Sequence, residues 1–167
     1  MTKPKTGDLV TESWQPGGLD DGPDEGGTAA DVRAPSVFSR AYPAVPRSVA
    51  AVRSAVGDFA AQAGAPQSTV DGIKLAVSEA ATNVIVHAYP DRSEPGLIHV
   101  EAARAGGELR ISVADTGPGL RTGRESPGLG LGLAIIGSLA DKVELLQGGD
   151  GLHVLMRFAL PADPTDP

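Results

Sequence analysis

The sequence predicts an α/β (α+β) two-layer sandwich, in which a mixed, mostly antiparallel sheet carries three helices on one face. Three observations favour this fold class. About five short segments alternate apolar and polar residues, and most are joined as hairpins by glycine-rich turns. Three further segments carry apolar residues at spacings of three and four, as amphipathic helices do. A chain of 167 residues with 41% hydrophobic residues has room for one core.

Residues 1–35 differ in composition from the rest of the chain. They hold seven acidic and three basic side chains, and the stretch 17–27 combines glycine, proline and acid with almost nothing to bury. Ordering such a stretch costs backbone entropy without an offsetting gain, so we predict a disordered acidic leader. Two interpretations of this leader stay open: it has no role, or it acts as a tether or an autoinhibitory arm. The folded domain then covers 36–161, and 162–167 form a short tail.

The composition excludes several classes of function. Without cysteine the chain has no thiol catalysis, cysteine-based zinc site or disulfide. The predicted domain has 11 basic and 12 acidic side chains, without the clustered Lys and Arg of a nucleic-acid-binding surface. The N-terminus lacks the apolar run of a signal peptide, and no run of about 18 apolar residues could span a membrane. We therefore expect a cytoplasmic protein that binds neither nucleic acid nor membrane.

The first half of the domain reads as a strand followed by two helices. The strand over 36–42 ends at proline, which cannot continue a ladder. Apolar residues spaced over 49–63 predict an amphipathic helix that ends at Gly64. A second helix opens after Pro66, and its apolar residues cover more than one face, which predicts burial on most sides. These residues are Val70, Ile73, Leu75, Ala76, Val77, Ala80, Ala81, Val84 and Ile85.

The second half reads as two hairpins with a loop and a helix between them. The hairpin turns are glycine-rich and lie at 105–107 and 148–151. A glycine-rich loop from Asp115 to Gly130 leads to a third helix over about 131–141. The hairpin strands cover 97–104, 108–114, 143–147 and 153–160.

Polar side chains on the second helix are the first candidates for chemistry. Glu79 and Asn83 lie four residues apart and so share one face, and His87 continues the line. A carboxylate on a mostly apolar helix is costly unless it is paired, hydrated or used. It can take a proton from a hydroxyl, and an amide oxygen is a hard ligand suited to Mg²⁺. By itself this pattern is more often an exposed polar stripe, and His87 is interpreted as a packed histidine.

A second candidate follows the strand 108–114. The carboxylate of Asp115 can accept a hydrogen bond from an exocyclic amine such as that of adenine. Gly117 and Gly119 would let a flat ring approach the backbone. The same five residues also make a good turn, so the segment alone does not decide between the two interpretations.

A third candidate introduces the last helix. Gly128, Gly130 and Gly132 stand at alternate positions, so backbone N–H groups at a helix start can face anionic oxygens. The spacing fits neither the P-loop nor the Rossmann motif. Arg121 and Arg124, between the two glycine segments, either reach phosphate or lie on the surface without a ligand.

The order and spacing of these elements resemble the GHKL ATPase superfamily. Its members carry a helix with E-x-x-x-N, a hairpin, D-x-G-x-G, a loop, and G-x-G-x-G at a helix start. Within it, residues 36–160 are most similar to the small single-domain anti-sigma-factor serine/threonine kinases. The stretches 75–89 and 130–141 resemble that family's first and third boxes. The resemblance implies a Bergerat-type fold, with ATP between the helix layer and the loop that joins Asp115 to Gly132.

The resemblance also implies a role for each candidate. Glu79 would be the general base for a substrate serine, Asn83 would hold Mg²⁺, and Asp115 would read the adenine amine. One position departs from the family: Leu152 stands where threonine is common, and losing that hydrogen bond would cost about 0.5–1.5 kcal/mol of nucleotide affinity. Room for the nucleotide would be left by Gly119 beside the ring and by Gly130 and Gly132 beside the phosphates.

The family role that fits one domain of this length is a regulatory switch. The resemblance implies an ATP-binding anti-sigma factor, a serine/threonine kinase that phosphorylates a STAS-type antagonist and sequesters a sigma factor, and it suggests a homodimer. Two alternatives stay open. One is a catalytically silent ATP-binding partner-switch module of the same fold, and the other is a domain whose glycine segments are merely turns.

Overall fold

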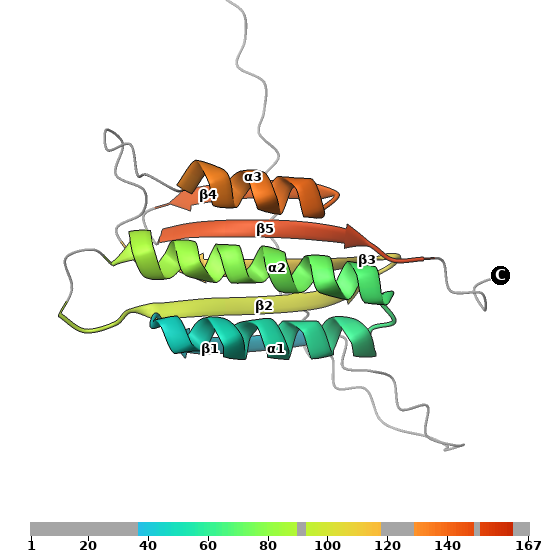
Figure 1. Cartoon of the computed structure of the whole chain (residues 1–167), viewed down its shortest axis with the longest axis horizontal. Helices are drawn as coiled ribbons and strands as arrows, with labels where there is room; N and C mark the ends of the chain where they lie inside the picture. The colour runs from blue at the N-terminus through green and yellow to red at the C-terminus, as the bar shows by residue number, and fades with distance from the viewer. Residues whose placement is uncertain (1–36, 90–92, 118–128, 149–150, 162–167) are drawn as a thin grey trace, which may run out of the picture. The chain divides into compact units, whose positions relative to one another are not determined.

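The computed structural model describes residues 37–89, 93–117, 129–148 and 151–161. Within them, three α-helices cover one face of a single five-stranded sheet (Figure 1). The predicted two-layer architecture with all helices on one face is therefore confirmed. The predicted leader, 1–35, and the predicted tail, 162–167, lie outside the described residues.

The elements lie close to their predicted bounds. The strands are β1 (Val37–Pro43), β2 (Leu97–Ala105), β3 (Glu108–Asp115), β4 (Lys142–Gly148) and β5 (Gly151–Ala159). The helices are α1 (Pro46–Gln62), α2 (Gln67–Asn83) and α3 (Leu129–Leu139), and a π-helical turn, η1 (Val84–Ala88), continues α2.

The sheet order is β1-β2-β3-β5-β4, and each of the four neighbouring pairs is antiparallel. The two central hairpin strands pair from Ala105 opposite Glu108 to Ile98 opposite Asp115. β5 pairs with β4 on one side and with β3 on the other, so β3 lies in the middle of the sheet. This order places the end of β3, with Asp115, between β2 and β5.

Alternation along the strands turns one face of the sheet toward the helices. On β3 and on β2 as far as Ala102, every second residue is almost completely buried, including Val100 and Ile111. The helices meet this face with residues spaced by three and four, such as Val52 and Val56 of α1. One expectation for α2 was wrong: Leu75, grouped with its buried residues, is 47% exposed, because it lies on the outer side of the helix layer.

Two further differences concern helix bounds. α3 begins at residue 129, about two residues before the predicted start, so Gly130 lies inside the helix instead of in the loop before it. After Asn83 the chain does not leave the helix but widens into η1, a π-helical turn that the sequence pattern did not predict. Such π-helical turns are rare, and they occur frequently at functional sites.

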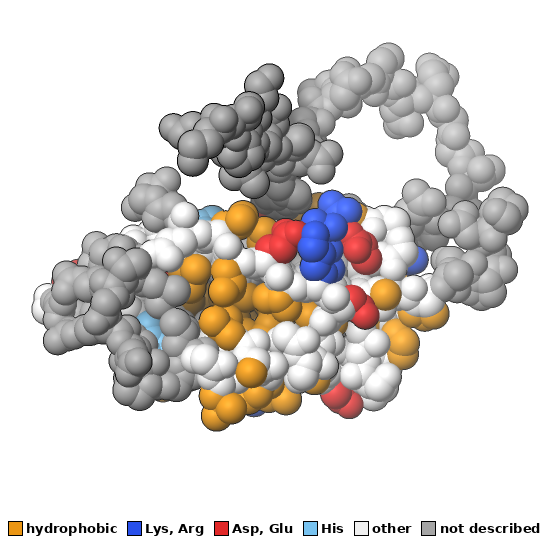
Figure 2. Space-filling model, turned by 90° about the horizontal axis from the view of Figure 1, so that it is seen from above, with side chains coloured by type: hydrophobic (Ala, Val, Ile, Leu, Met, Phe, Trp, Pro, Cys, Tyr) orange, Lys and Arg blue, Asp and Glu red, His pale blue; other side chains and the backbone are white. Residues whose placement is uncertain are grey.

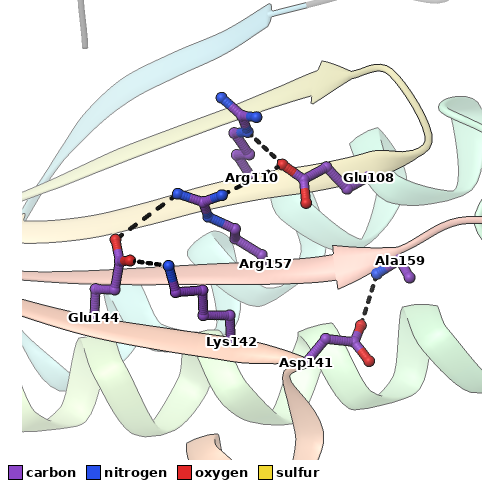
Figure 3. Close-up of polar contacts among 7 residues, drawn as sticks. All are labelled: Glu108, Arg110, Asp141, Lys142, Glu144, Arg157 and Ala159. Carbon is purple, nitrogen blue, oxygen red and sulfur yellow. Dashed lines mark hydrogen bonds and ion pairs between the residues drawn. The ribbon is translucent and has the colours of Figure 1, made fainter. Parts of the chain in front are cut away.

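The face of the sheet away from the helices carries a row of charged side chains (Figure 3). Arg110 contacts Glu108 at 2.6 Å, Lys142 pairs with Glu144, and Arg157 lies 3.8–3.9 Å from both acids. Because these side chains are in contact with solvent, water and salt screen the pairs, and each contributes little to stability. Alternating charges on the edge strand β4 also discourage pairing with another sheet.

Seen from the side of α3 and β4, hydrophobic side chains gather in the middle of the surface with charged side chains beside them (Figure 2). The large exposed hydrophobic residues of these two elements are Leu131, Leu145 and Leu146. None of the helices in the described ranges is long and apolar enough to cross a membrane.

Candidate functional site

The structure brings Glu79 and Asn83 of α2 against Gly132 of α3. A Cβ atom at position 132 would lie 3.3 Å from Oε2 of Glu79, and 3.2 and 3.3 Å from Nδ2 and Oδ1 of Asn83. These distances are shorter than ordinary van der Waals contacts, so only glycine leaves both polar groups where they are. Residues about 50 positions apart in the sequence therefore form one polar cluster between two helices.

Asn83 is the buried member of this cluster. Its side chain is 9% exposed, and its Nδ2 atom is buried without a hydrogen-bond partner among the described residues. Buried polar groups in proteins are nearly always hydrogen-bonded, so an unpaired amide indicates a place where a ligand supplies the missing partner. Oδ1 and Nδ2 are interchangeable by rotation of the amide, so the same side chain can present either a donor or an acceptor.

The donor set fits a hard cation that shares its ligands with phosphate. Asn83 offers an amide oxygen and Glu79, half-buried one turn away, offers a carboxylate. The described residues contain no group of three or more His, Asp or Glu side chains that could hold a metal ion by themselves. Mg²⁺ is commonly held by one or two side chains together with phosphates and water, so this set fits it.

A second part of the site surrounds Asp115 at the end of β3. Its carboxylate is 3% exposed, and its Oδ1 atom accepts a hydrogen bond of 2.8 Å from the backbone N–H of Gly117. A Cβ atom at Gly151 would overlap the carbonyl oxygen of Asp115, and one at Gly117 would overlap the carbonyl oxygen of Ala88. The carboxylate is thus oriented by backbone that approaches closely from two sides.

The turn η1 connects the two parts. It begins directly after Asn83 and ends at Ala88, whose carbonyl group packs against Gly117. His87 lies within η1 and is half-buried, and no contact in the described residues gives it a further role. One helical run, α2 followed by η1, therefore carries Glu79 and Asn83 in its second half, and its end contacts the segment after Asp115.

The other candidates have different outcomes. Gly130 is exposed in the first turn of α3, with no atom within 4 Å of where its Cβ would be. Leu152, at the position where the resemblance leads one to expect threonine, is buried at 8% exposure. The loss of the hydrogen bond that threonine would make in the nucleotide site stays a prediction. Four candidates, Gly119, Arg121, Arg124 and Gly128, lie outside the described residues.

The sequence interpretation missed Tyr89 and Gly96. Tyr89 is 9% exposed, and its hydroxyl contacts the backbone at Leu97 and Thr116. A Cβ atom at Gly96 would overlap its ring. A buried tyrosine directly after a helix, with a glycine just before the next strand, is the pattern that could have indicated this contact.

Known proteins are similar to this chain in sequence. Residues 42–158 match the family model described as the histidine kinase-like ATPase domain. The serine-protein kinase RsbW of Halalkalibacterium halodurans is 32% identical over 151 residues, which cover 81% of this chain and 90% of that protein. The anti-sigma F factor of Clostridium acetobutylicum is 30% identical over 125 residues, which cover 66% of this chain and 86% of that protein.

A solved structure is also similar to this chain in fold. The RsbU and RsbW domains of a Mycobacterium tuberculosis protein match with a TM-score of 0.60 at 27% identity. The match covers 74% of this chain, which spans about a third, 32%, of that longer chain.

The fold and the sequence together define a histidine kinase-like ATPase domain, and the chain belongs to this family. Within it, the chain groups with the proteins named serine-protein kinase RsbW and anti-sigma F factor. The resemblance inferred from the sequence motifs is therefore confirmed.

Proposed function

We propose that this protein is an anti-sigma regulatory factor that binds ATP and Mg²⁺, sequesters a sigma factor, and phosphorylates a serine of a STAS-type antagonist. The observation that carries the proposal is the cluster of Glu79 and Asn83 against Gly132, which joins a carboxylate to an unsatisfied buried amide. ATP is supported by membership of an ATPase-domain family. Kinase and anti-sigma activity are supported by the names of relatives about 30% identical.

Each residue of the cluster has a defined part in the proposed transfer. Glu79 accepts the proton of the substrate serine hydroxyl as the serine oxygen forms its bond to the γ-phosphorus of ATP. The bond from that phosphorus to the oxygen bridging to the β-phosphate breaks, and ADP leaves with the electron pair. When bound through Asn83, Mg²⁺ supplies positive charge that neutralises the phosphate oxygens.

The remaining residues orient the nucleotide. Asp115 accepts a hydrogen bond from the adenine amine, and Gly117 lets the ring approach the backbone. The first turn of α3, with Gly130 and Gly132, presents backbone N–H groups to the phosphates, because the first N–H groups of a helix have no partner within it.

The proposal is tested with the purified protein, Mg-ATP and a STAS-domain antagonist. Phosphoserine should form on the antagonist, and Glu79→Gln should reduce the rate about 10²- to 10⁴-fold, as expected for loss of a general base. The matched control is Asp71→Asn, an acid-to-amide change on the exposed side of the same helix, where the Asp71 carboxylate accepts a hydrogen bond from the Gln67 amide. If Glu79→Gln transfers phosphate as fast as the parent, the assignment of the base is wrong.

The partner assignment needs its own measurement. We expect the protein to retain a sigma factor in a pull-down with Mg-ATP and to release it when unphosphorylated antagonist is added. Light scattering of the protein alone and of the complex tests the proposed homodimer. Failure to retain any sigma factor of the same cell would contradict the anti-sigma assignment.

A catalytically silent module of the same fold is the second candidate function. The buried Leu152 favours it, because leucine cannot donate the hydrogen bond that threonine would offer to the nucleotide site. In that case nucleotide would change the affinity for the partner while no phosphate appears on any partner. Detectable phosphoserine rules this candidate out.

A further inference from the structure

The side chain of Tyr89 lies between two backbone segments that are distant in sequence. Its hydroxyl oxygen is 2.9 Å from the carbonyl oxygen of Leu97, 3.2 Å from the N–H nitrogen of Leu97, and 3.0 Å from the N–H nitrogen of Thr116. A phenol has one hydrogen to donate and an oxygen that accepts. Tyr89 therefore donates to the Leu97 carbonyl and accepts from the N–H groups of Leu97 and Thr116.

The position of the ring is as restricted as that of the hydroxyl. A Cβ atom at Gly96 would overlap ring atoms of Tyr89, so the ring fits only against a glycine backbone. The Thr116 hydroxyl lies 3.3 Å from the same phenol oxygen and adds a further polar contact. The Gly96 backbone prevents the ring from moving toward β2. The hydroxyl therefore stays within hydrogen-bond distance of the Thr116 N–H.

Thr116 is the residue after Asp115, and this makes the contact relevant to the nucleotide. Two successive backbone N–H groups after Asp115 are hydrogen-bonded. The Thr116 N–H donates to the Tyr89 hydroxyl, and the Gly117 N–H donates to the Asp115 carboxylate. The Ala88 carbonyl packs against Gly117. Residues 88–89, at the end of the helical run with Glu79 and Asn83, thus hold the segment that orients the Asp115 carboxylate.

We propose that Tyr89 is a positioning residue for base recognition, which fixes the Asp115 carboxylate where it accepts the adenine amine and links it to the helix carrying Glu79 and Asn83. The inference rests on the proposed nucleotide site. It assigns adenine selectivity to a residue that does not touch the nucleotide. A tyrosine that serves the fold alone would affect stability but not the preference for a base that carries the amine.

The test compares Tyr89→Phe with the matched control Tyr42→Phe. Tyr42 is also buried, at 8% exposure, but its hydroxyl has no hydrogen-bond partner within the described ranges. Affinities of both variants and the parent are measured by calorimetry for Mg-ATP and for Mg-purine riboside triphosphate, which lacks the 6-amino group. Measurements are made well below the melting temperature of each variant, so that only folded protein is compared.

The parent should bind ATP more tightly than the purine nucleotide, and Tyr89→Phe should lose most of that preference. We expect ATP binding to weaken roughly three- to tenfold, the range that one misplaced hydrogen bond explains, while the purine nucleotide binds as before. In the phosphotransfer assay KM for ATP should rise by the same factor with kcat at saturation unchanged. Tyr42→Phe should leave both affinities unchanged.

The outcomes separate this inference from the proposed function. A parent that binds ATP, together with a Tyr89→Phe variant that keeps the full preference for ATP, overturns the inference and leaves the nucleotide site intact. A parent that binds neither nucleotide overturns the proposed function and the inference with it.

A measurement on the parent covers the case in which Tyr89→Phe does not fold. Without nucleotide, the Thr116 amide should exchange its hydrogen as slowly as the amides inside β3, because the Tyr89 hydroxyl accepts it. Rapid exchange at Thr116 with slow exchange at Val113 would overturn the inference.

Discussion

Replacing Gly132 by alanine separates the stability of the fold from the function of the site. The change adds one methyl group inside α3, at 3.2–3.3 Å from polar atoms of Asn83 and Glu79. Ordinary contacts of a Cβ atom begin at about 3.4 Å, so both side chains must move by a few tenths of an ångström. The polar groups that would meet Mg²⁺ and the substrate hydroxyl are the groups displaced.

The two effects of this substitution have opposite signs. Alanine is favoured over glycine in a helix by about 0.8–1.0 kcal/mol, because glycine loses more backbone entropy. For a domain of this size that gain raises the melting temperature by about 3 °C. The close contacts of the new methyl group with Asn83 and Glu79 reduce this increase. Disturbing a hydrogen bond to a charged group costs about 1.5–3 kcal/mol, which is a loss of about tenfold to hundredfold in Mg-ATP affinity.

The assay combines thermal unfolding without nucleotide and calorimetric titration with Mg-ATP. The control is Gly137→Ala in the same helix, at an exposed position where no atom lies within 4 Å of the new Cβ. Gly137→Ala should raise the melting temperature and leave the affinity unchanged. If Gly132→Ala binds Mg-ATP as tightly as Gly137→Ala, the cluster of Glu79, Asn83 and Gly132 is not the nucleotide site.

Three further substitutions test other contacts. Asp115→Asn should weaken Mg-ATP binding about tenfold or more in calorimetry, since the acceptor for the adenine amine loses its charge; an unchanged affinity would contradict this role. Gly151→Ala should lower the free energy of unfolding by about 1–3 kcal/mol in urea titrations, because Gly151 has a φ of +114° and its Cβ would overlap the carbonyl oxygen of Asp115. The hydrogen bond and charge of Lys142 hold the pKa of Glu144 below its ordinary value of 4.5, so the pair stabilises the fold above about pH 4.5 and this contribution is lost as the pH falls below it. Glu144→Gln should therefore lower stability at pH 7 more than at pH 3, by a small amount that salt reduces further; equal effects at the two pH values would refute the pairing.

The helices and strands were predictable because their residues carry local information. The alternation on β2 and β3 and the three-to-four spacing on α1 report which face is buried, and proline and glycine mark where elements end. The turn η1 was not predictable in this way, because a π-helical turn needs no special residues and forms where tertiary contacts repay its poorer geometry. The early start of α3 was missed because glycine has a low helix propensity, so Gly130 was assigned to the loop although it is part of the helix.

For the site, the sequence by itself determined which side chains share a helix face and which segments can approach a ligand, since the spacing of Glu79 and Asn83 and the positions of the glycines are local properties. Only the tertiary structure decided that Gly132 lies against both side chains and that Tyr89 holds the segment after Asp115. These contacts join residues that are far apart in the sequence: Tyr89 and Thr116 are 27 positions apart, and Glu79 and Gly132 are 53 positions apart. They depend on how closely two backbones pack, which no local pattern of residue types encodes.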